Sequence, residues 1–113
     1  MKRRTETQLV KACLDLLTAR GHFCWRVNSG AMTGEHKGKR RFVRFNSARG
    51  VSDIVGMRNR DGRFFAIECK MDVNKPTKDQ HTFMCNVITG GGIALVQRDD
   101  TDGLIEAIEG ARP

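Results

Sequence analysis

Apolar residues recur every three or four positions in three segments of the chain, and this spacing predicts three amphipathic helices. The first begins with a capping box formed by Thr5 and Gln8 and stops at Gly21. The second opens at Pro76 and Thr77, and the third covers Thr101–Glu109. One face of each helix is apolar, so we expect each helix to pack with that face inward.

Shorter apolar or alternating segments between these helices predict β-strands. The segments are His22–Val27, Arg41–Phe45, Val51–Arg58, Arg63–Met71 and Ile93–Gln97. The second of them is a short edge strand within an otherwise loop-like stretch, and an Asp-Gly turn joins the third and fourth into a hairpin. The order α-β-(β)-β-β-α-β-α predicts an α/β fold in which helices flank a mixed sheet.

Composition narrows the class of protein. The 113 residues fit a single domain over residues 1–113, and 39% hydrophobic with 29% charged residues is typical of a globular chain. No segment resembles a signal peptide or a membrane span, so we expect a cytoplasmic protein without membrane contact. The four cysteines lack C-x-x-C spacing, which argues against a zinc ribbon. A formal charge of +7 favours a polyanionic partner, with nucleic acid ahead of an acidic membrane surface.

The hairpin carries the candidate chemistry. Asp53 lies near the start of its first strand, whereas Glu68 and Lys70 lie near the end of its second strand. Residues two apart on a strand share a face, and an antiparallel hairpin brings its two open ends together. We therefore expect Asp53, Glu68 and Lys70 to converge at one end of the sheet.

Two carboxylates and an ammonium group suit metal-dependent cleavage of a phosphodiester. The carboxylates bind Mg²⁺ or Mn²⁺ and leave positions open for water, and the metal activates that water. Lys70 orients the water or neutralises charge in the transition state. The alternative is a solvated, ion-paired strand face that contributes ~0–1 kcal/mol to stability. A buried strand usually ends in turn residues rather than in Glu-Cys-Lys, which favours the catalytic interpretation.

With these residues, the sequence resembles the PD-(D/E)xK nuclease superfamily, and more closely its virus-type replication-repair nuclease (VRR-NUC) branch. The resemblance extends from Glu6 to about Gln97. The matching positions, in order, are Glu6, Arg26-x-Asn28-Ser29-Gly30, Gly50-Val51-Ser52-Asp53, Glu68-Cys69-Lys70 and Thr77-x-x-Gln80. Val51 stands where the superfamily's name places a proline.

The resemblance implies a restriction-endonuclease-like core and hydrolysis of DNA with Mg²⁺ or Mn²⁺. Asp53, Glu68 and the backbone carbonyl of Cys69 would bind the metal, and Lys70 would be the catalytic lysine. The Cys69 side chain should then face the core. Stand-alone members of the branch are typically phage proteins that act on branched DNA, which implies a homodimer in a phage or its bacterial host.

Two further residues have both a functional and a structural interpretation. Glu6 projects from the apolar face of the first helix, near the metal according to the resemblance, but an acid in a first turn also favours the helix dipole. Gln80 is expected near the site as well, although Thr77-x-x-Gln80 is itself a capping box.

The stretch from Asn28 to Arg49 combines glycines with basic residues, which predicts phosphate contacts. Its candidate DNA-binding residues are Asn28, Ser29, Lys37, Lys39, Arg40, Arg41, Arg44 and Arg49. The alternative is a solvated loop. We expect Trp25 to lie in the core rather than to stack on bases.

The sequence as a whole predicts a metal-dependent, structure-selective DNA endonuclease that acts on four-way junctions. Two alternatives remain open: a flap or end-trimming nuclease on the same core, and a catalytically silent nucleic-acid-binding module. The presence of Asp53, Glu68 and Lys70 together argues against the silent module.

Overall fold

A computed structural model describes residues 4–27, 31–36, 39–44 and 48–112, with the backbone alone described at 31–36 and 39–44. The helices are α1 (Glu6–Ala19), α2 (Lys78–Thr89) and α3 (Leu104–Glu109). The strands are β1 (Phe23–Arg26), β2 (Ala31–His36), β3 (Lys39–Arg44), β4 (Ile54–Met57), β5 (Phe64–Lys70) and β6 (Ile93–Arg98).

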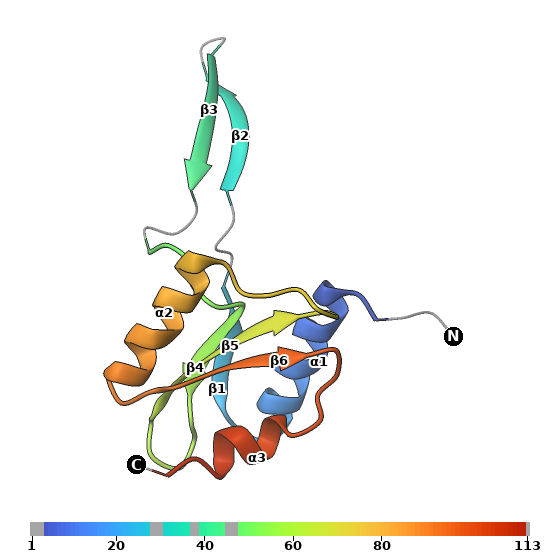
Figure 1. The fold of residues 1–113 in the computed structure, drawn as a ribbon, viewed down its shortest axis with the longest axis vertical. Helices are drawn as coiled ribbons and strands as arrows, with labels where there is room; N and C mark the ends of the chain where they lie inside the picture. The colour runs from blue at the N-terminus through green and yellow to red at the C-terminus, as the bar shows by residue number, and fades with distance from the viewer. Residues whose placement is uncertain (1–3, 28–30, 37–38, 45–47, 113) are drawn as a thin grey trace.

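A four-stranded mixed sheet forms the centre of the molecule, in the order β1-β4-β5-β6. Strand β4 pairs antiparallel with β1 on one side and with β5 on the other, whereas β5 and β6 are parallel. Parallel strands need a crossover connection, and α2 supplies it. Figure 1 shows α1 and α2 on opposite sides of the sheet. The predicted α/β fold, with helices flanking a mixed sheet, is confirmed.

The two faces of the sheet bury different amounts of apolar surface. Alternate residues of β5, such as Phe65 and Ile67, join α1 and α3 in the larger core. The opposite face has a smaller cluster, in which Val55 and Ala66 pack beneath Phe83 and other residues of α2. The helix α2 lies over β5 and β6, so it leaves β1 at the edge of this face uncovered.

Both long helices begin where the sequence predicts. Thr5 caps α1 and Thr77 caps α2, each in a capping box with the glutamine three residues later. The third helix is shorter than expected, because Thr101 and the two residues after it form a turn and α3 starts only at Leu104. No helix in the described ranges has the length and apolar character needed to cross a bilayer.

The basic stretch differs from the expected loop with one edge strand. Strands β2 and β3 pair with each other as an antiparallel hairpin, from Ala31 opposite Arg44 to His36 opposite Lys39, and form a separate two-stranded sheet. The glycines suggested a loop, but pairing satisfies the backbone of both strands. Figure 1 shows this hairpin projecting from the end of the central sheet at which α2 begins.

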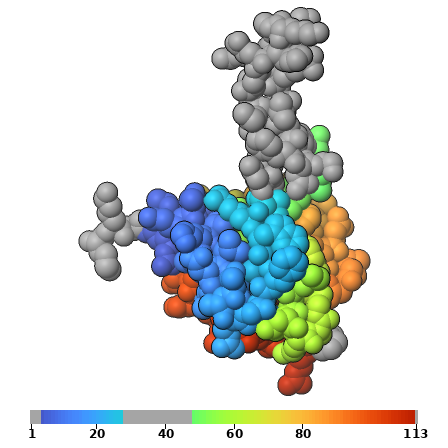
Figure 2. Space-filling model, turned by 180° about the vertical axis from the view of Figure 1, so that it is seen from behind, coloured from blue at the N-terminus to red at the C-terminus, as the bar shows by residue number. Residues whose placement is uncertain are grey.

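The expectation that Trp25 lies in the core is wrong. Its side chain is 45% exposed, and that of Phe23 on the same strand is 65% exposed. The reason is the position of β1 at the sheet edge, where α2 does not reach. Figure 2 shows β1 at the surface, between α1 and the turn that joins β4 to β5.

Candidate active site

The open end of the β4–β5 hairpin brings Asp53 and Glu68 together, as the sequence predicts. Ile54 pairs with Ile67, so Asp53 lies opposite Glu68 on the same face of the sheet. Asp53 Oδ2 accepts a hydrogen bond of 2.8 Å from the backbone N–H of Cys69. This bond replaces further backbone pairing, which explains why β4 starts at Ile54 rather than at the expected Val51.

Glu68 is a buried carboxyl group beside a second carboxyl group. Only 1% of its surface is exposed, and its Oε2 atom has no hydrogen-bond partner among the described residues. Burial, followed by the negative charge of Asp53 and a hydrogen bond with it, raises the pKa of Glu68 to about 8. At neutral pH the folded protein therefore favours the protonated form of Glu68.

Lys70 lies on the same face of β5, two residues beyond Glu68. Its Nζ atom is 3.9 Å from Glu68 Oε1, and its side chain is 12% exposed. The ammonium group lowers the pKa of Glu68, but this effect is smaller than those of burial and Asp53. Because the contact is long, the positive charge is not fully committed to Glu68 and can also face a ligand.

The Cys69 side chain points away from the acids and into the larger core, as expected. The neighbouring thiol of Cys13 on α1, together with burial, raises the pKa of Cys69. Both cysteines are buried and free of disulfides. The backbone of Cys69 therefore faces the site while its side chain anchors the strand end to α1.

Gly50 explains how α2 comes to lie beside the acids. Its φ of +67° favours glycine, and a Cβ atom there would collide with the backbone of Asp79 and Gln80. The first turn of α2 thus packs directly on the chain three residues before Asp53. Within that turn, the Gln80 side chain accepts a 2.8 Å hydrogen bond from Thr77 N–H, which confirms its capping role.

Glu6 is half-buried in the first turn of α1. Its charge contributes to the raised pKa of Glu68, as the weakest of the effects that act on that group. The structure therefore places Glu6 within electrostatic range of Glu68. Its role at the site, like that of Gln80, stays a prediction.

The donor set fits a hard divalent cation. Two adjacent carboxylates, one of which has a buried oxygen without a partner, repel each other unless a proton or a cation lies between them. No cluster of three or more His, Cys, Asp and Glu side chains within the described ranges could hold a metal. Asp53 and Glu68 would therefore need the Cys69 carbonyl and water to complete the coordination.

Four of the eight predicted DNA-binding residues fall on strand β3 of the β2–β3 hairpin. Asn28, Ser29 and Lys37 lie outside the described residues, and β3 contains the four that follow: Lys39, Arg40, Arg41 and Arg44. The side chain of Arg49 is exposed, one residue before Gly50. Contact between this group and DNA stays a prediction.

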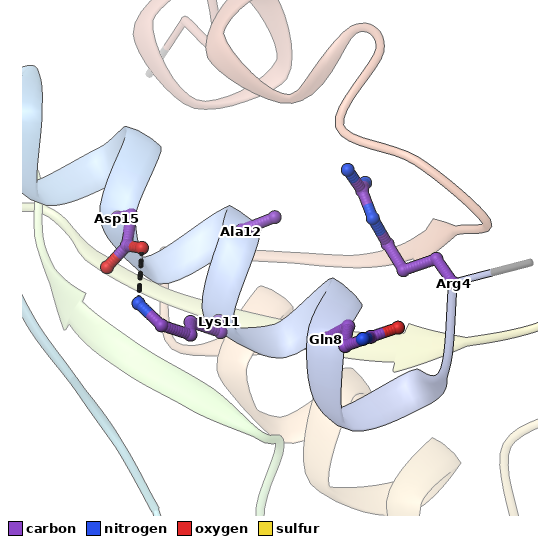
Figure 3. A pocket seen from close by; sticks show the side chains of 5 residues that line it. All are labelled: Arg4, Gln8, Lys11, Ala12 and Asp15. Atoms are coloured by element: carbon purple, nitrogen blue, oxygen red, sulfur yellow. Dashed lines mark hydrogen bonds and ion pairs between the residues drawn. The ribbon is translucent and has the colours of Figure 1, made fainter. Parts of the chain in front are cut away.

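An open hollow of about 400 Å³ on α1 is separate from the site. It is lined by Arg4, Gln8, Lys11, Ala12 and Asp15. Figure 3 shows the ion pair of 2.7 Å between Lys11 and Asp15 along one side of it. Neither acid of the hairpin lines this hollow, so we assign it no role in the chemistry.

One buried charge was missed by sequence reasoning. Arg58 is 1% exposed, and its guanidinium group bonds both carboxylate oxygens of Asp61 and the carbonyls of Ile108 and Ala111. Its place directly before the predicted turn gave no signal of burial.

No protein-family model and no curated protein matches the chain.

Proposed function

We propose that this protein is a divalent-metal-dependent, structure-selective DNA endonuclease of the VRR-NUC type that cleaves four-way junctions. The observation that carries the proposal is the pair of Asp53 and Glu68, which are held against each other with a buried oxygen unpartnered and Lys70 alongside. A structural ion pair would satisfy its charges, whereas this arrangement fits a bound cation.

Each residue has a distinct task in the proposed reaction. Asp53 and Glu68, with the Cys69 carbonyl, would hold Mg²⁺ or Mn²⁺, which when bound polarises the phosphate and lowers the pKa of a coordinated water. The bond from Cys69 N–H fixes the Asp53 carboxylate in place before substrate binds. Lys70 Nζ offers a positive charge to the phosphate oxygens as water adds to phosphorus and the P–O bond to the leaving sugar oxygen breaks.

The surroundings of the site suit a polyanionic substrate. The chain carries a formal charge of +7, and strand β3 of the hairpin that projects beside the site contains four of its 20 Lys and Arg residues. We propose that this hairpin and Arg49 contact the DNA backbone on either side of the cleaved bond.

A homodimer would match the substrate. A four-way junction has two-fold symmetry and needs two cuts in opposed strands, and a two-fold dimer supplies two sites at a fixed separation. A domain of 113 residues also leaves little surface for recognising a branched DNA alone.

The test is cleavage of labelled linear, flap and four-way DNA substrates with Mg²⁺, with Mn²⁺ and with EDTA. We expect paired, symmetric cuts in the four-way junction with metal and none in EDTA, and a dimer by light scattering at micromolar concentration. The Lys70→Ala variant, purified identically, controls for contaminating nucleases. A monomer that trims flaps and leaves junctions whole would favour the flap nuclease, and binding without cleavage of any substrate would favour the silent module.

A further inference from the structure

An exposed aromatic pair lies on the edge strand β1. The rings of Phe23 and Trp25 have centroids 5.3 Å apart and planes tilted by 48°. The register places Phe23 beside Met57, and Met57 beside Phe64, and both of these side chains are also partly exposed. A contiguous apolar surface of this kind on a small domain usually marks a site of contact.

The aromatic pair shares a sheet face with the two acids. Trp25 pairs with Val55, and Asp53 lies two residues from Val55 and therefore on the same face. Val27 N–H donates a 2.8 Å hydrogen bond to the carbonyl of Asp53, so the chain beyond β1 runs alongside the acid. Trp25 and Asp53 are diagonal neighbours in this antiparallel pair, and such neighbours have Cα atoms about 7–8 Å apart. Trp25 therefore lies beside the candidate active site.

The arrangement favours a nucleobase as the occupant. A strand with its phosphate at Asp53 and Glu68 would carry its neighbouring bases over the uncovered half of this face, where the aromatic rings lie. Stacking on tryptophan and phenylalanine suits every base because each has a π-face. A base within a duplex is already stacked on its neighbours, so only an unpaired base can use the rings.

We propose that Phe23 and Trp25 form a stacking site for an unpaired nucleobase of the strand that is cleaved at Asp53 and Glu68. The proposal rests on the proposed nuclease function and adds to it a contact with a base that unpairs at the branch point of the junction, beside the cut. The base contacts supply affinity without sequence selectivity, and the nearby acids supply the chemistry.

Trp25 is the only tryptophan of the chain, so its fluorescence reports on this site directly. The full chain in EDTA is titrated with a single-stranded oligonucleotide, a blunt duplex, and a duplex with a single-stranded overhang. We expect the single strand and the overhang to quench the emission and the blunt duplex to leave it unchanged.

Single-residue variants distinguish base stacking on the two aromatic rings from non-specific electrostatic attraction between the protein and DNA. By anisotropy of labelled DNA, Trp25→Ala and Phe23→Ala should weaken overhang binding by about 5- to 150-fold relative to the blunt duplex. Trp25→Phe should retain most of the binding because a ring remains. Ile88→Ala, a truncation of another exposed side chain (57%) on α2, is the matched control and should change nothing.

The outcomes distinguish this proposal from the nuclease proposal. Metal-dependent cleavage with unchanged emission, and equal binding by Trp25→Ala, would overturn the stacking site and leave the nuclease standing. Selective quenching without cleavage of any substrate would support the stacking site and remove the nuclease. If Trp25→Ala converts a dimer to a monomer, and emission follows protein concentration rather than DNA, the surface joins two copies and the stacking proposal is wrong.

Discussion

The β4–β5 hairpin buries a charged side chain at each of its two ends, and the two environments are opposite. At the turn, Arg58 is 1% exposed, and its guanidinium group bonds both Asp61 oxygens and two backbone carbonyls. At the open end, Glu68 is equally buried, but its nearest charged neighbour across the hairpin is another acid and one of its oxygens has no partner among the described residues.

The electrostatic consequences differ in sign. Arg58 holds the pKa of Asp61 below its usual range, so the charged pair is favoured in the folded protein. Burial and Asp53 raise the pKa of Glu68 to about 8, so the folded protein disfavours its charge. One end is a completed ion pair that supports the fold, whereas the other is a donor set that a cation would complete. Burial of a charge alone therefore does not identify a functional site, whereas incomplete compensation of that charge does: Lys70 lies near Glu68 but only partly offsets the effects of burial and Asp53.

The largest expected effect is on catalysis at the open end. Asp53→Asn, Glu68→Gln and Lys70→Ala should each lower DNA cleavage by about 10³-fold or more, because they remove metal ligands or charge stabilisation worth several kcal/mol. Cleavage of a labelled junction, with circular dichroism as a folding check, measures this. Glu106→Gln, which removes an exposed charge from α3, is the control. Wild-type cleavage by Lys70→Ala would show that the site is assigned to the wrong strand.

The next largest effect is on stability at the turn. Arg58→Met should lower the free energy of unfolding by about 1–3 kcal/mol, since it leaves the buried carbonyl of Ile108 and the partly buried carbonyl of Ala111 without their donor. Urea denaturation measures the change. Arg60→Met in the same turn removes an exposed guanidinium group and should cost about 1 kcal/mol or less. Equal losses in the two variants would contradict the structural role of Arg58.

The pH dependence of stability tests the open end without DNA. The pKa of Glu68 is about 8 in the folded chain and near 4.5 in an unfolded one, so the folded state holds the extra proton between these values. Protonation of Glu68 therefore stabilises the folded state fully below about pH 4.5, and this contribution is lost as the pH rises through 8. In EDTA, the melting temperature of the wild type should therefore fall relative to that of Glu68→Gln as the pH increases across this range. Parallel curves would mean that Glu68 ionises normally.

The smallest effect is expected at Cys69. Its side chain lies in the core and only its backbone faces Asp53, so Cys69→Ala should retain cleavage within about two-fold. Loss of the buried thiol should cost about 1 kcal/mol of stability. Parallel cleavage and urea measurements separate these effects. A large loss of cleavage with a normal fold would indicate that the thiol itself acts at the site.

Local sequence signals were sufficient for much of the fold and for the candidate site. Capping boxes placed the starts of α1 and α2, and the period of two along β5 put Glu68 and Lys70 on one face and Cys69 on the other. Hairpin geometry then brought Asp53 opposite Glu68. These features depend on neighbouring residues or on one turn, so the sequence contains the information needed to predict them.

Features that depend on distant packing were not predicted. Trp25 is exposed because α2 covers β5 and β6 rather than the edge strand, and no residue of β1 encodes that choice. Arg58 is buried because the end of α3 supplies carbonyls about fifty residues later. The β2–β3 pairing was missed because Gly34 lies inside a strand, where glycine usually suggests a loop.

The attachment of Arg58 to the carbonyls of Ile108 and Ala111 also has a consequence during synthesis on the ribosome. The guanidinium group cannot reach these acceptors until Ala111 has been added to the chain, about fifty residues after Arg58 itself. At typical elongation rates this interval lasts about 3–10 s. Over that time the nascent hairpin carries an incompletely compensated cation at its turn, so stable folding has to wait until α3 emerges.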